Sequence, residues 1–448
     1  MTEPESDRHL LVPHLAPAGR SSVWVGVVDA PVDGLRLKAG PIDRPIPDAW
    51  DTFEAGGRRL RTQRIGLDGL PERASIPVVL TDAAQVLATA RITTLPVRLP
   101  TVADRPFTIL FGSCFCARRD AAGAVGATFA RLPPDARPDL TLLCGDQAYL
   151  DEPALHYLAH THRPDELAAE LLATCLETWT QAGPLSGFRR VHQLASVAFS
   201  SDDHDLWNNA PSLGPLARDT WTAGGRAAWL DAARRLYRLF QADAPWQVVD
   251  VGALSIFVGD TRMARTEDHA RFMEPSQLAA LQSWVAGLRG PGALVTGQPV
   301  FTETTGLKGD LMDRGLADFQ QYGELVRILL GARHDIVILT GDVHFGRAAS
   351  CRLANGRQIV ELIASPFALV SDFAAGHWKP APGRFPAVPV PGEPGAHIAT
   401  EAYRETANHA MTVGFSGVGP EVRMQATSWP VRAGQPAVGT PVLSTRLQ

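Results

Sequence analysis

The sequence predicts a layered α/β domain preceded by a smaller all-β domain. From about residue 106 onward, apolar runs of strand length alternate with segments of helical periodicity, a pattern typical of α/β proteins. Before that point the chain shows short alternating runs separated by turn residues, without a helical stripe. A length of 448 residues also favours more than one domain. We therefore expect a loose tail at 1–20, a β-sandwich at 21–102 and the α/β domain at 103–448.

The N-terminal part contains four clear strand patterns. They lie at residues 22–28, 57–65, 76–80 and 86–94. Turn-forming pairs such as Asp68-Gly69 separate them. Short strands at this spacing are typical of a small sandwich of the immunoglobulin or fibronectin type. Residues 1–20 are rich in proline and charge and predict the loose tail, and a Pro-rich stretch at 93–106 links the two domains.

The C-terminal part alternates apolar strands with helices. The strands are expected at residues 107–112, 140–144, 197–199, 254–258 and 336–339. The helices are expected at residues 121–132, 164–181, 226–242, 275–288 and 319–330. Residues 374–396 are rich in proline and glycine, so we expect a surface insertion or lid there. Two alternating runs, at 410–416 and 421–427, are expected to close a sheet edge.

Composition limits the partners and the compartment. Hydrophobic residues make up 45% of the chain and charged residues 20%, as in an ordinary globular protein. The net charge of −5 gives no sign of nucleic-acid or membrane binding. The N-terminus is acidic and lacks a long apolar segment, so we expect neither a signal peptide nor a transmembrane helix. Five cysteines, an odd number, favour a reduced, cytoplasmic chain. The oligomeric state is left open.

Clusters of chemically active residues follow five of the apolar strands. They are GSC at 112–114, GDQAY at 145–149, SDDHD at 201–205, GDTR at 259–262 and GDVH at 341–344. In open α/β sheets, ligands bind at the carboxyl ends of the strands. Five such clusters in one chain, rich in Cys, Asp, His and Arg, predict a single polynuclear metal site.

The carboxylates and imidazoles of these clusters are candidate metal ligands. A dinuclear hydrolytic site needs an anionic ligand that bridges two cations. Asp146 is the best candidate, because the preceding Gly145 lets the backbone turn tightly beneath the metals. Further ligands at other strand ends are Asp203, Asp342 and His344.

Two further donors, a thiol and a phenol, indicate which metals the site takes, and one histidine is a candidate general acid. Cys114 offers a thiolate, which selects iron or zinc rather than magnesium. Tyr149 offers a phenolate, which suits a ferric ion. His204 lies between Asp203 and Asp205, so either neighbour can hold it protonated as a general acid.

Taken together and in this order, the five motifs resemble the alkaline phosphatase D (PhoD-like) branch of the calcineurin-like metallophosphoesterases. The resemblance covers roughly residues 20–370. It implies a four-layer α/β/β/α catalytic domain that hydrolyses phosphate monoesters or diesters, with a metal-bound hydroxide as nucleophile. It also implies two metal ions: Fe3+ and a divalent ion, which is Ca2+, Mn2+, Zn2+ or Fe2+. The partner is then a small phosphate ester.

The resemblance also implies roles for individual residues. The first metal takes Cys114, Asp146, Tyr149 and His344, and the second takes Asp146, Asp203 and Asp342. His204 faces the substrate and protonates the leaving oxygen, and Arg262 steadies the charge on the phosphate. One departure is Phe115, where such proteins commonly have asparagine.

Several alternatives stay open. The chain can instead be a non-catalytic phosphate- or metal-binding protein, or a mononuclear zinc protein that uses Cys114, Cys116 and a histidine. Arg262 can merely pair with a carboxylate, and Arg265 competes for its role. Two residues downstream are candidates to line the substrate cleft, Gln298 and Tyr322. Three histidines with metal-like spacing are expected to be solvated or to face the cleft: His156, His160 and His162.

Overall fold

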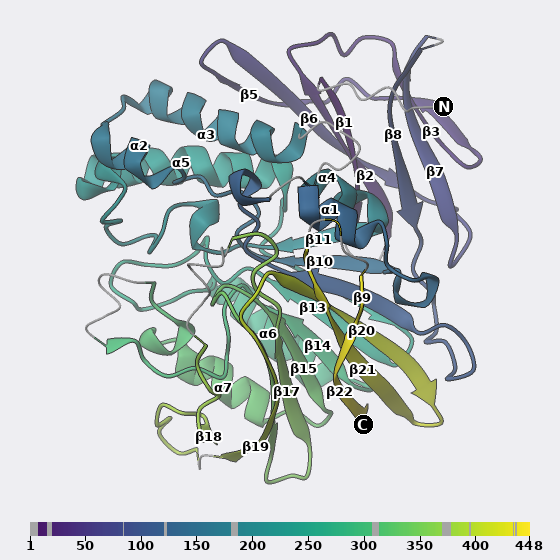
Figure 1. Ribbon diagram of the computed structural model, residues 1–448, viewed down its shortest axis with the longest axis vertical. Helices are drawn as coiled ribbons and strands as arrows, with labels where there is room; N and C mark the ends of the chain where they lie inside the picture. The colour runs from purple at the N-terminus through teal and green to yellow at the C-terminus, as the bar shows by residue number, and fades with distance from the viewer. Residues whose placement is uncertain are drawn as a thin grey trace.

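The computed structural model describes residues 8–15, 20–83, 85–120, 123–180, 187–306, 313–369, 378–393, 396–432, 434 and 437–448. Two large β-sheets and one smaller sheet dominate this part of the chain (Figure 1). The largest has ten strands, in the order β22 (Thr440–Leu447), β21 (Glu421–Pro430), β20 (His409–Val418), β9 (Phe107–Gly112), β10 (Leu140–Cys144), β11 (Ser196–Ser200), β1 (His9–Leu15), β2 (Ser21–Val28), β6 (Arg58–Leu67) and β5 (Asp51–Ala55).

The other two sheets are smaller. The eight-stranded sheet has the order β12 (Trp246–Val251), β13 (Leu254–Gly259), β14 (Gly292–Val295), β15 (Ile336–Thr340), β17 (Gln358–Ile363), β16 (Gly346–Arg352), β19 (Ala396–Glu405) and β18 (Arg384–Phe385). The four-stranded sheet has the order β4 (Ile42–Pro45), β3 (Leu35–Ala39), β7 (Ser75–Asp82) and β8 (Gln85–Thr93).

The two large sheets pack face to face, and helices cover the outer face of each sheet. The helices of the described residues are α1 (Ala124–Phe129), α2 (Ala154–Ala159), α3 (Pro164–Thr180), α4 (Gly187–Leu194), α5 (Ala223–Phe240), α6 (Pro275–Gly287) and α7 (Tyr322–Leu330). One apolar cluster joins α3, α4 and α5 to the ten-stranded sheet. Another joins α6 and α7 to the eight-stranded sheet. Among these residues, no helix is long and apolar enough to cross a membrane.

A third apolar cluster lies between the two large sheets. It contains Ile109 and Leu142 of the ten-stranded sheet and Ile256 and Val337 of the eight-stranded sheet. Strands β9, β10 and β11 run parallel, as do β13, β14 and β15. Strands β9, β10 and β15 are fully buried, which explains why their sequences are continuously apolar. The result is a mixed α/β fold with large sheets, in which two parallel sets of strands bring their carboxyl ends together.

The expected loose tail at 1–20 is wrong for residues 9–15, which form β1. This strand pairs antiparallel with β2 and parallel with β11, and all of its residues are buried. Its sequence, HLLVPHL, carries enough apolar residues to lie inside a sheet despite its proline. Residues 1–7 and 16–19 lie outside the described part of the chain.

The predicted β-sandwich at 21–102 shares a sheet with the α/β part. All four predicted strands are found, as β2, β6, β7 and β8. However, β2, β5 and β6 continue the ten-stranded sheet that contains β9, β10 and β11. The four-stranded sheet packs on them through a cluster that includes Val23, Val25, Leu37 and Val78. No break in strand pairing therefore marks a boundary near residue 102.

The C-terminal predictions have mixed outcomes. The runs at 410–416 and 421–427 form strands β20 and β21, but β20 lies between β21 and β9, and β22 forms the sheet edge that they were expected to close. The Pro/Gly-rich segment 374–396 is only partly a surface feature, because Phe385 (1% exposed) and Val390 (5%) are buried in the cluster beneath α6 and α7. Residues 374–377 and 394–395 of this segment lie outside the described part of the chain.

Candidate metal centre

The strand-end loops deliver their polar residues with strained backbones. Four of the predicted ligands have positive φ angles: Cys114 (58°), Asp146 (59°), Asp342 (69°) and His344 (58°). Non-glycine residues seldom adopt this conformation, and it is concentrated at functional sites because the surrounding structure must hold it in place. The loops after β9, β10 and β15 are therefore shaped to aim these side chains.

Two glycines allow the loops to interlock. A Cβ atom on Gly145 would lie 2.5 Å from the Cβ of Asp202, and Gly145 itself has a φ of 96°. A Cβ atom on Gly341 would lie 2.1 Å from the Oγ of Ser113. Only glycine fits at these contacts. The first contact joins the loops after β10 and β11 of the ten-stranded sheet, and the second joins the loop after β15 of the eight-stranded sheet to the loop after β9.

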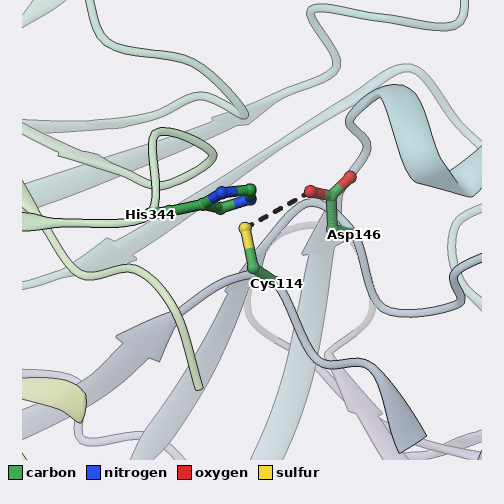
Figure 2. A group of neighbouring side chains, drawn as sticks. All are labelled: Cys114, Asp146 and His344. Carbon is green, nitrogen blue, oxygen red and sulfur yellow. Dashed lines mark hydrogen bonds between the residues drawn. The ribbon is translucent and has the colours of Figure 1, made fainter. Parts of the chain in front are cut away.

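The first candidate group consists of Cys114, Asp146 and His344. A ligand atom from each lies within 4.8 Å of the others, and the sulfur of Cys114 is 3.3 Å from Oδ2 of Asp146. Figure 2 shows the carboxylate of Asp146 and the ring of His344 gathered around this sulfur. The hydroxyls of Ser113 and Ser365 lie 3.3 Å and 3.2 Å from the same atom. The thiol, carboxylate and imidazole are thus arranged as one donor set.

The electrostatics of this group favour a cation. Burial raises the pKa of Cys114 well above its ordinary value, and the negative charges of Asp146 and Asp342 raise it further. Burial likewise raises the pKa of Asp146, with Asp203 adding to the effect. Burial lowers the pKa of His344 to about 4, so its ring is neutral and able to donate a lone pair. A bound cation would compensate the negative charge that these groups otherwise cannot carry.

Tyr149 lies beside the first group. Its hydroxyl is 3.5 Å from Oδ2 of Asp146, and its ring stacks on that of His204 with centroids 4.1 Å apart. Burial raises the pKa of Tyr149 well above its ordinary value, and the neighbouring Cys114 raises it further. The phenol is therefore within reach of the same donor set but needs a nearby cation to ionise.

The second candidate group consists of Asp146, Asp203 and His204, so Asp146 belongs to both groups. Oδ2 of Asp203 accepts a hydrogen bond from the backbone N–H of Asn209 at 3.1 Å. Its other oxygen, Oδ1, is buried and has no hydrogen-bond partner among the described residues. Buried oxygens of this kind are normally satisfied, so Oδ1 fits a metal ligand.

His204 is paired with Asp151, which the sequence analysis did not identify. Nδ1 of His204 lies 2.6 Å from Oδ1 of Asp151, whose Oδ2 accepts the N–H of Asn208 at 2.8 Å. Burial alone would lower the pKa of His204, but Asp151 and Asp203 outweigh it and raise the pKa well above its ordinary value. The signal for Asp151 was its place two residues after Tyr149, at the end of GDQAYLD.

The expectation that Asp205 supports the imidazole is wrong. Its Oδ2 accepts the backbone N–H groups of Asp146 and Asp202 at 2.9 Å and 3.0 Å. Its Oδ1 accepts the side-chain amide of Gln241 at 3.0 Å. Burial raises the pKa of Asp205 to about 6. Asp205 thus ties the loops after β10 and β11 together and does not face the ring of His204.

The third candidate group, Asp202, Asp203 and Asp313, already contains a cation. The buried guanidinium of Arg262 donates two hydrogen bonds to Asp313, at 2.9 Å and 2.6 Å, and one to Asp202 at 3.2 Å. It also lies 3.7 Å from Asp203. This favours the alternative in which Arg262 pairs with carboxylates. Sequence analysis missed Asp313, which follows no strand pattern and comes directly after the undescribed residues 307–312.

The two residues predicted to line the cleft, Gln298 and Tyr322, lie in different parts of the structure. The amide of Gln298 donates to Oδ2 of Asp342 at 3.0 Å and also to Asp313, and its oxygen accepts from Arg265. Gln298 therefore belongs to the centre, as support for Asp342, whose carboxylate joins none of the three groups found among the described residues. Tyr322 lies in the apolar cluster beneath α7, where its hydroxyl donates to the carbonyl of Val300 at 2.8 Å. Its expected place in the cleft is wrong.

The remaining candidates lie outside the three groups. Phe115 stacks on Phe188 in the apolar core, with centroids 4.5 Å apart. Cys116 is buried in a small cluster with Cys114 and Tyr149. Of the three spaced histidines, His162 has its Nδ1 2.7 Å from Asp219. The described residues contain no metal-binding group built from these histidines or from Cys116.

Comparison with known proteins supports the fold. No family model matches the sequence, and no curated protein matches it. A solved structure described as that of PhoD matches 98% of this chain and 89% of its own, with a TM-score of 0.65 and 13% sequence identity. A second, described as GAP50, the anchor in the inner membrane complex of Plasmodium, covers 76% of this chain and 90% of its own, with a TM-score of 0.39 and 10% identity.

The chain has a PhoD-like fold. At 13% identity the first match shows the arrangement of elements and no more, and the second is too distant to support an argument.

Proposed function

We propose that this protein is a metal-dependent phosphoesterase that hydrolyses small phosphate esters. The observation that carries the proposal is that Asp146 is shared by two groups, one with Cys114 and His344 and the other with Asp203 and His204. In the second group Asp203 is the other ligand, whereas His204 is held protonated and serves as an acid. A shared carboxylate between two donor sets is what a binuclear hydrolytic site requires. The four-layer order of the catalytic domain and an immunoglobulin- or fibronectin-like identity for the N-terminal strands belong to the same proposal.

The donor types suggest which metals the site takes. We assign Cys114 and Tyr149 to a Fe3+ ion, because a thiolate and a phenolate suit a ferric centre. Asp203 and Asp342 then serve a divalent ion, which is Ca2+, Mn2+, Zn2+ or Fe2+. When bound, the two ions activate a water molecule and neutralise charge on the phosphoryl group.

The protein groups have separate tasks in this scheme. His204, held by Asp151 and stacked on Tyr149, donates a proton to the leaving oxygen. Arg262 acts as a positioning residue, because its guanidinium already binds Asp313 and Asp202. It keeps the carboxylate of Asp203 in place and does not meet the phosphate directly.

The test is turnover by the purified chain. After reconstitution with Fe3+ and each divalent ion in turn, the protein should hydrolyse bis(p-nitrophenyl) phosphate or p-nitrophenyl phosphate, and Asp146→Asn should not. Protein that holds two metals but turns over no member of a phosphate-ester panel would support the non-catalytic alternative. One zinc ion and no second metal would support the mononuclear alternative.

A further inference from the structure

A separate cavity lies at the junction of the N-terminal strands and the α/β part. It encloses about 160 Å³ between β1, β2, β6 and β11 and the segment 241–247 that follows α5. None of its lining residues belongs to the three metal-ligating groups. It is smaller than the roughly 300–1,000 Å³ of pockets that hold drug-sized ligands, so it suits a compact molecule.

About half of the cavity wall is apolar. The side chains that provide this character are Leu15, Val197, Phe199, Trp246 and Val258. Phe199 is buried, whereas Trp246 is half-buried, so the indole ring forms the more accessible side. A wall of this kind binds a flat or branched hydrocarbon body through the hydrophobic effect.

Arg64 supplies a positive charge in the cavity wall. Its Nη2 donates to the carbonyls of Arg238 and Gln241, at 2.8 Å and 3.1 Å, which fixes the guanidinium at the end of α5. Its Nη1 lies 3.7 Å from Asp243, too far for a hydrogen bond, and Nη1 and Nε make no hydrogen bond to any residue the structure describes. The Arg64 side chain is 21% exposed and that of Asp243 is 65% exposed. Arg64 is thus fixed in position but keeps N–H groups that can donate to a ligand. The neighbouring carboxylate of Asp243 is largely exposed and makes no hydrogen bond to it.

Gly66 leaves part of the wall open. It lies opposite Ser22 in the pairing of β6 with β2. Gly66 is exposed, and a Cβ atom added there would meet nothing within 4 Å, so it lies at an open side of the cavity. The hydroxyl of Ser22 already donates to the carbonyl of His14 at 3.1 Å, so it can accept a further hydrogen bond. The cavity therefore has room next to its polar end.

We propose that this cavity binds a small organic carboxylate with an apolar body of about the size of one aromatic ring. The carboxylate accepts a charge-assisted hydrogen bond from the unused Nη1 of Arg64, in place of the nearby Asp243. The apolar body lies against Trp246 and Val197. An inorganic anion would satisfy Arg64 but leave the apolar wall unpaired, and a neutral aromatic molecule would leave the guanidinium without a counter-charge.

The cavity is connected to the metal centre by hydrogen bonds. The carbonyl of Gln241 accepts from Arg64, and its side-chain amide donates to Asp205 at 3.0 Å. Asp205 in turn accepts the backbone N–H of Asp146. A ligand that binds Arg64 can therefore shift Gln241 and, through Asp205, the loop that carries Asp146. We infer that ligand binding alters phosphate-ester turnover, an inference that rests on the proposed function.

The test is titration of the full-length protein with benzoate, with benzamide as the neutral control, by isothermal calorimetry and ligand-observed NMR. Benzoate should bind saturably with one site per chain, and benzamide roughly tenfold or more weakly, because it lacks the charge-assisted hydrogen bonds. Gly66→Val should weaken binding strongly, because it places a branched side chain at the open side of the cavity. Equal binding of the two compounds, or equal binding to Gly66→Val, would overturn the proposal.

A second variant works in the opposite direction and does not touch the packed wall. Asp243→Asn removes the competing carboxylate at an exposed position, so benzoate should bind roughly two- to fivefold more tightly, with benzamide unchanged. Weaker benzoate binding would contradict the role given to Arg64. The binding measurements need no catalytic activity, so they stand apart from the proposed function. Saturating benzoate should also change the initial rate in the wild type but not in Gly66→Val; an unchanged wild-type rate would remove the coupling through Gln241.

Discussion

The two ends of the candidate centre both bury several acidic groups, but they differ in what offsets the negative charge. At one end, Asp202, Asp203 and Asp313 surround the guanidinium of Arg262, which supplies positive charge from within the chain. At the other end, Cys114 and Asp146 are fully buried and the ring of His344 is held neutral by burial; the imidazolium of His204 lowers the pKa of Asp146 but does not offset burial and the charge of Asp203. In the proposed centre the first end is stable as an ion cluster, whereas the second needs a cation from solution to offset its buried charge.

The difference indicates where metal ions are needed and where they are not. Three groups have metal-like spacing, but spacing alone does not distinguish an ion pair from a metal site. The presence of Arg262 marks the third group as structural. In the proposed function we read the first two groups as the metal sites, because they share Asp146 and because Arg262 already pairs with the carboxylates of the third. Each prediction below alters one end and leaves the other as the control.

The largest effect is expected for Asp146→Asn. It removes the one carboxylate that both metal groups contain, so both ions should be lost together and turnover should fall by about 10³-fold or more, as when a preorganised charge is removed from an active site. Elemental analysis and initial rates measure the two effects. A variant that keeps two metal equivalents and near-normal turnover would show that Asp146 is not the bridge.

His204→Ala should have an effect that depends on the leaving group. General acid assistance supplies about 10²–10⁴-fold, so an alkyl phosphate ester should lose activity in that range and a nitrophenyl ester much less. Metal content should be unchanged. Asp151→Asn should lower the pKa of His204 and move the alkaline limb of the pH–rate profile to lower pH, because the acid form is then lost sooner. Equal losses on both esters would mean that His204 binds phosphate instead.

Arg262→Gln should destabilise the fold. It leaves buried carboxylates without their cation, and removal of one partner from a buried ion pair typically costs about 3–5 kcal/mol. Chemical denaturation of the metal-free protein measures this loss. In the same assay Asp146→Asn should be neutral or stabilising, since it removes a buried charge that burial and the neighbouring Asp203 disfavour. If both variants lose similar stability, the contrast between the two ends of the centre is wrong.

The stability of the metal-free protein should depend on pH through Asp146. Burial raises its pKa in the folded state, so the folded protein binds the proton more tightly than the unfolded chain. This contribution is complete below the ordinary value of 3.8 and is lost as pH rises through the folded value. The melting temperature of Asp146→Asn relative to the wild type should therefore rise with pH from about 4 upward. A difference that is constant with pH would contradict the assignment.

The smallest effect is expected for Tyr149→Phe. A phenolate bound to ferric iron gives a visible charge-transfer colour, so iron-loaded wild type should be tinted and the variant bleached. Turnover should fall by about tenfold or less, because the other donors remain. Iron-loaded wild type that is colourless would place Tyr149 outside the ligand set.

The candidate metal ligands could be predicted from the sequence, whereas the residues that hydrogen-bond to the catalytic groups, Asp151 and Asp313, could not. Cys114, Asp146, Asp203 and His344 all follow apolar strands, and parallel strands bring such ends together by a general rule. Asp151 and Asp313 were missed because their roles depend on long-range partners that no local pattern reveals. The same limit explains Tyr322, whose position at the start of a helix says nothing about which face is buried.

The fold was predictable where periodicity is strong. The buried parallel strands and the longer helices were found close to their true bounds. Strand β1 was missed because its proline and its charged surroundings resemble a tail, although its pairing with β2 and β11 places it inside the sheet. Strand order across a sheet of this size is a property of tertiary packing, and so the continuity between the N-terminal strands and the α/β part could not be read from local patterns.

Anomalous X-ray diffraction from crystals of the metal-loaded protein tests the central claim most directly. Data collected on both sides of the absorption edges locate and identify each ion. We predict two peaks, one among Cys114, Asp146 and His344 and one between Asp146 and Asp203, with no peak in the Asp202–Asp313 group around Arg262. A single peak that Asp146 does not contact, or a peak that displaces Arg262 from Asp313, would contradict the account.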